Sequence, residues 1–349
     1  MEKIKFDLEN VMLDYIKKHP NNSSREIYEG LGKIVAVATM KRKIATLLDK
    51  NLIITIGRGK ATKYVISSGF DVLFPIDVEI YFEKEIDERE VKVGFSFDLI
   101  KAVLNEIQLF TNEEMERLSN LQKNFTNNIS KLTKAEYNLE FERLAIDLSW
   151  KSSQIEGNTY SLLETEKLLK EKETASGKTK DEAVMLLNHK ATLDFILENP
   201  DYVNPISVAR IEDIHSLLVE GLGIDRNIRN RRVGISGTNY KPLDNAFQIK
   251  EALEAMCILI NGRENIFEKG LLALVLLSYI QPFSDGNKRT ARIISNAILI
   301  NYTYCPLSFR TVDSIDYKKA MLVFYEQNNI SIFKKIFMEQ FEFAVKTYF

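Results

Sequence analysis

The sequence predicts a mainly α-helical protein with a small β-hairpin near its N-terminus. From residue 98 to the end, apolar residues recur at helical spacing in almost every segment. Residues 52–66 instead hold two short runs rich in β-branched residues around a glycine-containing turn, which is typical of a hairpin. The 349 residues, 45% hydrophobic and 28% charged, indicate a globular protein of two or three domains with a sizeable core.

The composition also limits the environment and the partners. A formal net charge of −2 excludes attraction of the whole chain to nucleic acid or membrane, so any such affinity must be local. The first ten residues lack the apolar centre of a signal peptide, and the apolar run 271–280 is too short to cross a bilayer. Cys257 and Cys305 are isolated among apolar neighbours, without metal-binding spacing. We therefore expect a cytoplasmic protein without membrane contact.

Residues 1–68 are predicted to form a separate domain. Apolar residues at helical spacing indicate helices at about 8–18, 25–31 and 37–50, followed by the hairpin. This order resembles a winged helix-turn-helix module, which places its third helix in the major groove of DNA. The side chains that would contact phosphates are Lys41, Arg42, Lys43, Arg58, Lys60 and Lys63. Such modules also serve in protein docking and dimerisation, so the sequence leaves open DNA contact, protein contact and self-association.

Two further segments complete the organisation of the chain. Residues 69–97 carry many acidic residues without clear helical periodicity, and we interpret them as a linker with short extended pieces. Residues 98–349 are predicted to form one helical domain. Two of its residues, His189 and His215, lie among apolar residues at helical spacing, which favours buried imidazoles over catalytic groups.

The stretch 281–292 has the pattern of a phosphate-binding loop. It lies between two apolar helical runs, so its centre is a short polar loop that opens a helix. Gly286 permits a backbone turned toward a ligand, and the first N–H groups of the next helix are free to hold an anion. Arg289 and Arg292, on roughly one helical face, add forked donors for phosphate oxygens. Asp285 is a hard oxygen ligand suited to Mg²⁺. The residues alone also fit an ordinary surface turn.

This stretch resembles the signature of the Fic family, His-Pro-Phe-x-(Asp/Glu)-Gly-Asn-(Gly/Lys)-Arg-x-x-Arg. Every fixed position agrees except the first, where Gln281 stands in place of the histidine. The resemblance implies an all-helical Fic core over about residues 98–349, and transfer of AMP from ATP to a Ser, Thr or Tyr hydroxyl of a target protein. It also implies that Asp285 holds Mg²⁺ and that the nucleotide is bound by Gly286, Asn287, Lys288, Arg289 and Arg292.

A second motif lies at the end of the helix predicted over about residues 140–157. Ser152, Glu156 and Gly157 match the pattern (Ser/Thr)-x-x-x-Glu-(Gly/Asn), which resembles the Fic inhibitory motif. At a helix C-terminus the dipole disfavours a carboxylate, so Glu156 needs a cationic partner. The resemblance supplies one, because in the family this glutamate pairs with the last arginine of the signature, here Arg292, and keeps the γ-phosphate out. The alternative is a solvated helix end without a regulatory role.

Residues 226–242 alternate polar and apolar side chains before a Ser-Gly-Thr-Asn turn, which predicts a small hairpin. This resembles the Fic flap, which lines up a segment of the target by adding a strand beside it. The residues assigned to this role are Val233, Gly234, Ile235, Ser236 and Gly237. An ordinary surface hairpin is the alternative.

The departure at Gln281 changes the expected activity. In the family, the histidine accepts the proton of the target hydroxyl, whereas a glutamine amide can orient a hydroxyl but cannot take its proton. Loss of a general base costs roughly 10²–10⁴ in rate. We therefore expect an autoinhibited AMP-transferase that binds ATP and Mg²⁺ but transfers weakly. Two alternatives remain. One is a non-enzymatic regulator that senses nucleotide and binds DNA, and the other is the phosphorylation chemistry of the Doc branch, to which Lys288 points.

Overall fold

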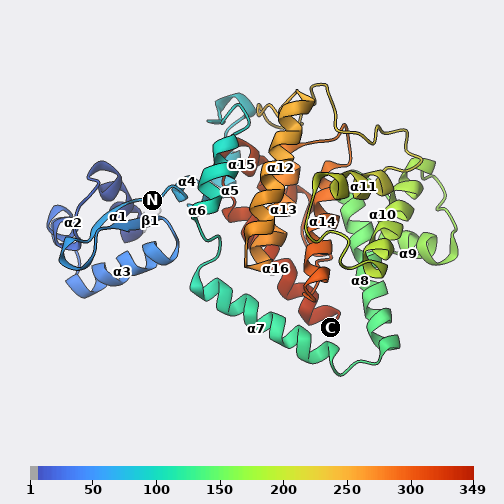
Figure 1. The fold of residues 1–349 in the computed structure, drawn as a ribbon, viewed down its shortest axis with the longest axis horizontal. Coiled ribbons are helices and arrows are strands. Elements are labelled where there is room, and N and C mark those ends of the chain that lie inside the picture. The colour runs from blue at the N-terminus through green and yellow to red at the C-terminus, as the bar shows by residue number, and fades with distance from the viewer. Residues whose placement is uncertain (1–6) are drawn as a thin grey trace.

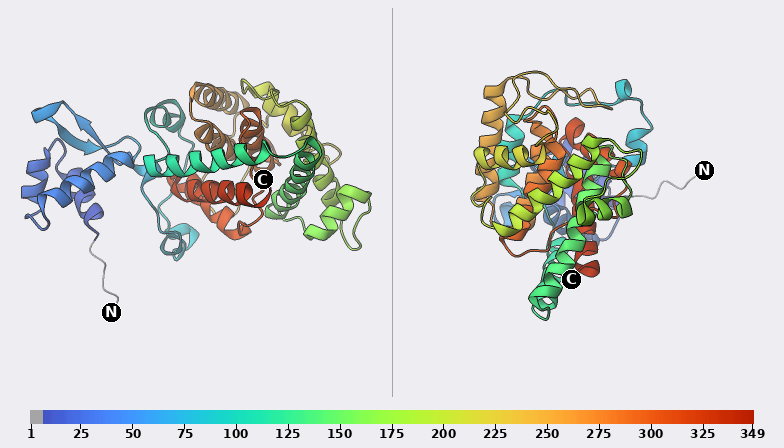
Figure 2. Two further views of the ribbon diagram at one scale, coloured as in Figure 1. Left: turned by 90° about the horizontal axis from the view of Figure 1, so that it is seen from below. Right: turned by 90° about the vertical axis from the view of Figure 1, so that its right-hand side faces the viewer.

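The computed structural model describes residues 7–349, and these are mainly helical, as the sequence predicts (Figure 1). The only sheet within this range has two strands. An N-terminal unit lies at one end of the molecule, and a larger helical unit forms the rest (Figures 1 and 2). None of the helices in residues 7–349 combines the length and apolarity needed to cross a membrane.

The N-terminal unit contains the three helices and the hairpin expected from the sequence. Its elements are α1 (Leu8–Lys18), α2 (Ser24–Gly30), α3 (Val37–Asp49), β1 (Ile53–Ile56) and β2 (Lys63–Ile66), with a 3₁₀ turn (Gly59–Ala61) between the strands. The strands pair antiparallel, with Ile53 opposite Ile66. The three helices bury Met12, Leu13, Ile16, Ile27, Met40, Ile44 and Leu47. The role of this unit in DNA binding stays a prediction.

Residues 70–94, which we call the strap, lie in the segment that the sequence predicts to be a linker with short extended pieces, but much of the strap is helical. They form two short helices and a 3₁₀ turn, namely α4 (Phe70–Leu73), α5 (Val78–Phe82) and Ile86–Glu88. Backbone bonds fasten the strap to the larger unit, from Ile330 N to Val72 O at 2.8 Å and from Lys92 N to Glu326 O at 2.7 Å. Single helical turns carry no recognisable periodicity, and these partners lie far along the chain, so the local pattern could not reveal the packing.

The central helix of the larger unit is α13 (Ile266–Ile280). It begins at Asn265, whose side chain accepts hydrogen bonds from the first turn, and all its side chains from Phe267 onward are buried. From residue 271 the helix is apolar on nearly every side, which is typical of an interior helix. Each Leu or Ile buried there contributes about 1.5–3 kcal/mol to the free energy of folding. Its neighbours are α12 (Ala246–Gly262), α14 (Asn287–Asn301), α15 (Ser314–Gln327) and α16 (Ser331–Thr347) (Figure 1).

Two other helices bring the sequence motifs together. Both α8 (Lys134–Ile155) and α11 (Val208–Leu218) pack against α14. Thr133 and Glu136 form a capping box that starts α8, and the helix ends at Glu156. The predicted inhibitory helix, α8, therefore lies against α14, which begins in the stretch 281–292 that we call the signature loop. The remaining helices are a π-helical stretch (Leu99–Val103), α6 (Leu104–Glu106), α7 (Asn112–Ile129), α9 (Leu162–Glu171) and α10 (Lys180–Glu198).

Residues 226–242 form no strand, so the hairpin predicted for this segment is wrong. Its backbone groups bond to other parts of the chain, from Arg229 N to Pro282 O at 3.0 Å and from Lys241 N to Val93 O at 2.8 Å. The alternating pattern is real, because Val233 and Ile235 are partly buried and their neighbours are exposed. Extended chain that lies along a core shares this alternation with strands. We call residues 233–237 the docking segment.

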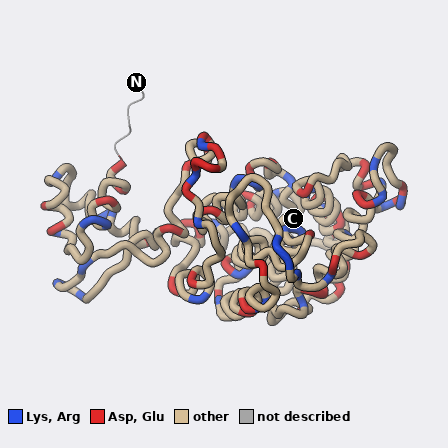
Figure 3. Tube along the Cα trace, turned by 90° about the horizontal axis from the view of Figure 1, so that it is seen from above, with Lys and Arg blue, Asp and Glu red and all other residues tan. Residues whose placement is uncertain are grey.

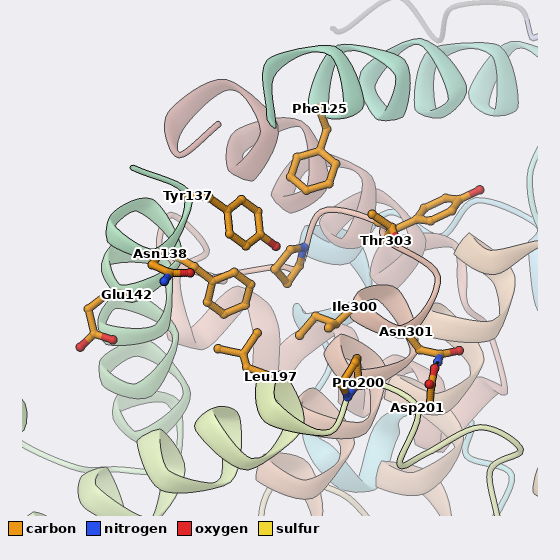
Figure 4. A pocket seen from close by; sticks show the side chains of 13 residues that line it. Phe125, Tyr137, Asn138, Glu142, Leu197, Pro200, Asp201, Ile300, Asn301 and Thr303 are labelled. Carbon is orange, nitrogen blue, oxygen red and sulfur yellow. Dashed lines mark hydrogen bonds between the residues drawn. The ribbon is translucent and has the colours of Figure 1, made fainter. Parts of the chain in front are cut away.

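A cavity of about 490 Å³ lies near the C-terminal end of α14, at the opposite end of that helix from the signature loop (Figure 4). Phe125, Tyr137 and Leu197 are among its lining residues. Asn301 donates a hydrogen bond to Asp201 at 2.7 Å within the lining. No site residue predicted from the sequence lines this cavity, so its size alone does not mark the functional site.

Candidate active site

The candidate active site is built at the loop that joins α13 to α14. α13 ends at Gln281 in the left-handed conformation, with φ 52°, and α14 begins after Gly286, whose φ is 81°. A larger residue at Gly286 would be strained, and its Cβ would lie 3.3 Å from Val219 and 3.4 Å from His215. No side chain caps the start of α14, so its first N–H groups and its dipole are available to an anion.

The buried side chain of Arg229 holds the first part of this loop. Its Nε donates to Gln281 O at 2.7 Å, and its backbone N–H donates to Pro282 O at 3.0 Å. Two carbonyl oxygens that would repel an anion are thereby engaged with protein donors. Sequence analysis missed Arg229, because only the folded chain brings it beside the loop.

His215 holds the second part of the loop. It is buried, as the sequence predicts, and its ring stacks on Phe283 with centroids 3.6 Å apart and an angle of 4°. Its Nε2 lies 3.0 Å from Asp285 O, and because a carbonyl oxygen only accepts, this nitrogen carries the proton. Burial lowers the pKa of His215, and the nearby charge of Arg289 lowers it further. A neutral imidazole therefore supports the loop, a role that the apolar sequence context did not reveal.

Gln281 and Asn287 fill the inside of the loop. Gln281 Nε2 donates to Ser278 O at 2.7 Å and to the Tyr325 hydroxyl at 3.3 Å, and its Oε1 accepts from Asn287 Nδ2 at 3.1 Å. Asn287 also bonds both backbone groups of Phe283 at 2.8 Å. Both amide side chains are thus hydrogen-bonded within the protein. Asn287, which was predicted to bind nucleotide, stabilises the loop through these bonds.

Arg289 and Arg292 supply buried positive charge beside the start of α14. Their exposed fractions are 1% and 0%. The Nε and Nη1 of Arg289 and the Nη1 of Arg292 have no hydrogen-bond partner among residues 7–349. Burial lowers the pKa of Arg289, as expected for a charge that has lost water without gaining a full partner. Unpaired buried donors are costly, so the arrangement favours an anionic ligand. We call these two side chains and the N-terminus of α14 the anion cradle.

Ser152 and Glu156 occupy one side of the anion cradle. Arg292 donates its Nε to Ser152 Oγ at 2.8 Å and its Nη2 to Ser152 O at 2.9 Å. The same Nη2 lies 2.8 Å from Glu156 Oε1, and Lys288 Nζ lies 3.3 Å from Glu156 Oε2. The expected ion pair between Glu156 and Arg292 is present, and Lys288, predicted to bind nucleotide, joins it as a second cation. Gly157 follows with φ 101° and ends the helix.

The charge state of Glu156 follows from these neighbours. Burial acts to raise the pKa of this carboxyl, but the positive charges of Arg292 and Lys288 outweigh it, and the pKa is lowered. Burial likewise acts to lower the pKa of Arg292, while Tyr317 and Glu156 raise it above its ordinary value. Both partners are therefore ionised at neutral pH.

Asp285 lies at the outer end of the loop. Its carboxylate side chain is 68% exposed and lies 3.6 Å from Arg289 Nη2, and its Oδ1 accepts from Gly286 N at 2.6 Å. Residues 7–349 contain no group of three or more His, Cys, Asp or Glu side chains that could hold a metal ion. Asp285 therefore suits a divalent cation only together with ligands that are not protein side chains.

A cavity of about 310 Å³ lies beside Glu156. Its wall joins four parts of the chain: the end of α8, the docking segment, the start of α14 and the face of α15. The lining residues are Ile155, Glu156, Ile235, Ser236, Lys288, Lys318, Met321, Leu322 and Tyr325. Ile235 and Ser236 are thus the docking residues that reach the site. Val233, Gly234 and Gly237 do not line it.

The basic residues predicted to contact DNA belong to the N-terminal unit and do not join this site. Lys41, Arg42, Arg58 and Lys60 are exposed. Lys43 instead forms an ion pair with Glu9 at 2.7 Å. The two regions would therefore act through separate surfaces.

Comparison with known proteins relates the site to one family. Residues 205–299 match the Fic/DOC family. A protein adenylyltransferase Fic of Nematostella vectensis is 29% identical over 179 residues, which cover 48% of this chain and 40% of that protein. The protein of the same name from Aedes aegypti is 28% identical over 166 residues, which cover 44% of this chain and 32% of that protein. The matched region thus spans less than half the length of these relatives.

Solved structures share the fold. Fic-1 from C. elegans superposes with a TM-score of 0.58 over 97% of this chain and 94% of that chain, at 16% identity. A Fic domain containing signaling protein from Bacteroides thetaiotaomicron gives a TM-score of 0.56 over 66% of this chain and 94% of that chain, at 19% identity. At these identities the likeness establishes the fold, and the chemistry must be argued from the residues.

The environment of His215 predicts a pH dependence of stability. Its folded-state pKa lies below the ordinary value of 6.5. Its contribution is therefore fully present above about pH 6.5 and is lost as the pH falls through the lowered folded-state value. The variant His215→Gln keeps a donor for Asp285 O but does not titrate. Between about pH 7.5 and 5.5, urea unfolding should show a smaller loss of unfolding free energy for the variant than for the wild type. His189, whose pKa burial also lowers, accounts for a remaining loss. Equal losses in both proteins would contradict this assignment.

Proposed function

Residues 205–299 match the Fic/DOC family, and on this premise we propose that the chain is a Fic-type AMP-transferase scaffold held inactive by Glu156. The observation that carries the proposal is the 2.8 Å ion pair between Glu156 and Arg292, which joins the two sequence motifs at one anion cradle. Relatives named protein adenylyltransferase Fic support AMP transfer as the reaction class. The proposed acceptor is a Ser, Thr or Tyr hydroxyl of a target protein.

ATP and Mg²⁺ fit the residues of the anion cradle. The unpartnered N–H groups of Arg289 and Arg292 and the uncapped start of α14 suit the phosphates of ATP. Lys288 adds a third cation beside them. Asp285 would hold Mg²⁺ together with phosphate oxygens and water, which is the coordination that Mg²⁺ prefers. When bound, ATP would supply the AMP group, and Mg²⁺ would offset the phosphate charge.

The cavity beside Glu156 suits the nucleoside part of the ligand. Its volume of about 310 Å³ falls at the lower end of the range for small-molecule sites, roughly 300–1,000 Å³. Ile155, Met321 and Leu322 give it aliphatic walls, and Lys318 and Tyr325 supply polar groups. Its position between the anion cradle and the docking segment supports the assignment.

Glu156 opposes nucleotide binding by occupying donors that phosphate oxygens need. Its two carboxylate oxygens engage Arg292 and Lys288, and a second anion at these cations would meet the negative charge of Glu156. The pKa of Glu156 is lowered, so the pairing is fully present above the ordinary carboxyl pKa and is lost only as the pH falls through the lowered folded-state value. Inhibition should therefore operate at neutral pH.

Gln281 limits the transfer step. Its amide can orient an acceptor hydroxyl by hydrogen bonding, but it cannot accept the proton that the hydroxyl must release. Its polar atoms are engaged with Ser278, Tyr325 and Asn287. We therefore infer that nucleotide binding and proton removal are separated in this chain, with the first retained and the second weakened.

A second candidate function is a nucleotide-sensing regulator that binds DNA through the N-terminal unit. It is favoured by four exposed basic residues without an ion-pair partner within residues 7–349, namely Lys41, Arg42, Arg58 and Lys60. The N-terminal unit carries acidic as well as basic residues along its chain (Figure 3). A steep decrease of DNA affinity with salt would support this function, whereas salt-independent binding or none would exclude it.

Removal of Glu156 should strengthen ATP binding. Glu156→Gly frees Arg292 and Lys288, and we expect the Kd for ATP to fall on the order of tenfold, which is a typical coupling between competing interactions. Isothermal titration calorimetry measures the change. Glu198→Gly, which removes an exposed acid from the end of α10, is the matched control and should leave the Kd unchanged. An unchanged Kd in Glu156→Gly would exclude Glu156 as the inhibitor.

Asp285 should account for the effect of Mg²⁺. In the Glu156→Gly background, Asp285→Ala should abolish the increase in ATP affinity caused by Mg²⁺, because no other acid lies in residues 281–292. Calorimetry with Mg²⁺ and with a chelator compares the two conditions. Full Mg²⁺ dependence in the variant would place the metal elsewhere.

Restoring an imidazole should separate the base from the inhibitor. Gln281→His with Glu156→Gly should transfer AMP on the order of a hundredfold faster than Glu156→Gly alone, because the acceptor proton then has a base. Gln281→His alone should gain little, since Glu156 still occupies Arg292. Labelling of lysate proteins from ATP labelled at the α-phosphate measures all three variants. Equal rates in the first two would show that the missing base is not what limits transfer.

A further inference from the structure

The docking segment is a short stretch of open backbone held at both ends. Apart from the turn at Ser236–Gly237, the backbone N–H and C=O groups of residues 233–236 form no hydrogen bond with any other part of residues 7–349. An extended peptide can pair with such groups as it would with the edge of a sheet. Because the segment is not part of a sheet, its conformation depends on what holds its ends.

The two ends are held by different regions. On the N-terminal side, Arg229 fastens the chain to the signature loop through Gln281 O and Pro282 O. On the C-terminal side, the strap provides the contacts. Asn239 Nδ2 donates to Asp87 Oδ1 at 2.9 Å, and Lys241 N donates to Val93 O at 2.8 Å.

Arg89 of the strap makes the contact nearest to the open backbone. Its Nη2 donates to Gly237 O at 2.7 Å, and the same Nη2 lies 3.4 Å from Glu326 Oε1. The guanidinium lies over the Phe82 ring at 5.0 Å, and Tyr81 donates to the other oxygen of Glu326 at 2.6 Å. Burial on all these sides fixes the direction in which Arg89 can donate.

The contacts also reach the wall of the smaller cavity. Glu326, which pairs with Arg89, follows Tyr325, whose hydroxyl accepts from Gln281. Ile235 and Ser236, which line the same cavity as Tyr325, precede the Gly237 carbonyl that Arg89 holds. Arg89 therefore links α15 and the docking segment on two sides of the site.

We propose that Arg89 is a positioning residue that fixes the C-terminal end of the docking segment, so that an extended segment of a target protein can pair beside the anion cradle. The inference rests on the proposed function for the meaning of that pairing. The positioning itself is a property of the chain and can be tested without transfer activity.

The test compares amide hydrogen exchange in wild type, Arg89→Lys and Lys92→Gln. Lysine keeps a positive charge near Glu326 but lacks the planar fork that also reaches Gly237 O. Exchange at the amides of Tyr240 and Lys241, which donate to Thr238 Oγ1 and Val93 O, should become on the order of tenfold faster in Arg89→Lys, while residues 281–292 keep their wild-type rates. Lys92→Gln changes an exposed strap cation that pairs with Asp71 at 3.4 Å and should leave both regions unchanged.

Two results would overturn the proposal. One is wild-type exchange at Tyr240 and Lys241 of Arg89→Lys. The other is an equal increase in residues 281–292, which would mark a general loosening. Arg89→Gln, without charge, provides a second variant with the same expectation.

A functional arm separates this inference from the proposed function. In the Gln281→His, Glu156→Gly background, Arg89→Lys should lower labelling of lysate proteins on the order of tenfold while the Kd for ATP stays constant, since misplacement of a reacting group costs rate. Loss of ATP affinity together with labelling would contradict positioning. Absence of labelling in every variant would remove the transferase assignment, whereas the exchange experiment would still decide the role of Arg89.

Discussion

Two guanidinium groups buried on α14 constrain the arrangement around them. Charges removed from water cost several kcal/mol each unless they are paired, so Arg289 and Arg292 require partners from elsewhere in the fold. Arg292 finds them in Ser152 and Glu156 of α8 and in the Tyr317 ring, 5.2 Å from its guanidinium carbon. Arg289 keeps donors without partners. The contacts that Ser152 and Glu156 make with Arg292 meet this need in part, and the unpartnered donors give the site its preference for anions.

The parts of the site that could be predicted are those whose functional residues lie within a few positions of one another in the sequence. The loop 281–292 and the motif from Ser152 to Gly157 each carry their residue types within a few positions, and the folded chain brings them together. Arg229, His215 and Arg89 act on partners roughly 50 to 150 positions away, so no local spacing could disclose them. The amphipathic helices were likewise predictable, because their periodicity extends over several turns.

Errors arose where the backbone bonds to distant partners. Residues 226–242 have the alternation of a strand, yet their groups pair with the signature loop and the strap, so no hairpin forms. Each helix of the strap is too short to show helical periodicity in its sequence. The path of the strap is determined by backbone hydrogen bonds to Glu326 and Ile330 of the larger unit. In both segments the hydrogen-bond partners lie far away in the sequence and are brought close by the tertiary fold. A local sequence pattern contains no information about such distant partners.

The location of Glu156 on the same chain as the anion cradle has a further consequence. A carboxylate joined covalently to the site it occupies behaves as a ligand with an effective concentration, in the millimolar range for short flexible connections, that dilution of the protein cannot lower. Under the proposed function, ATP would compete with this tethered anion, and the outcome would depend on how readily the last turn of α8 opens before Gly157. The local stability of that single turn would then set the nucleotide concentration to which the protein responds. Any contact that loosens or tightens the turn shifts this threshold without touching the nucleotide.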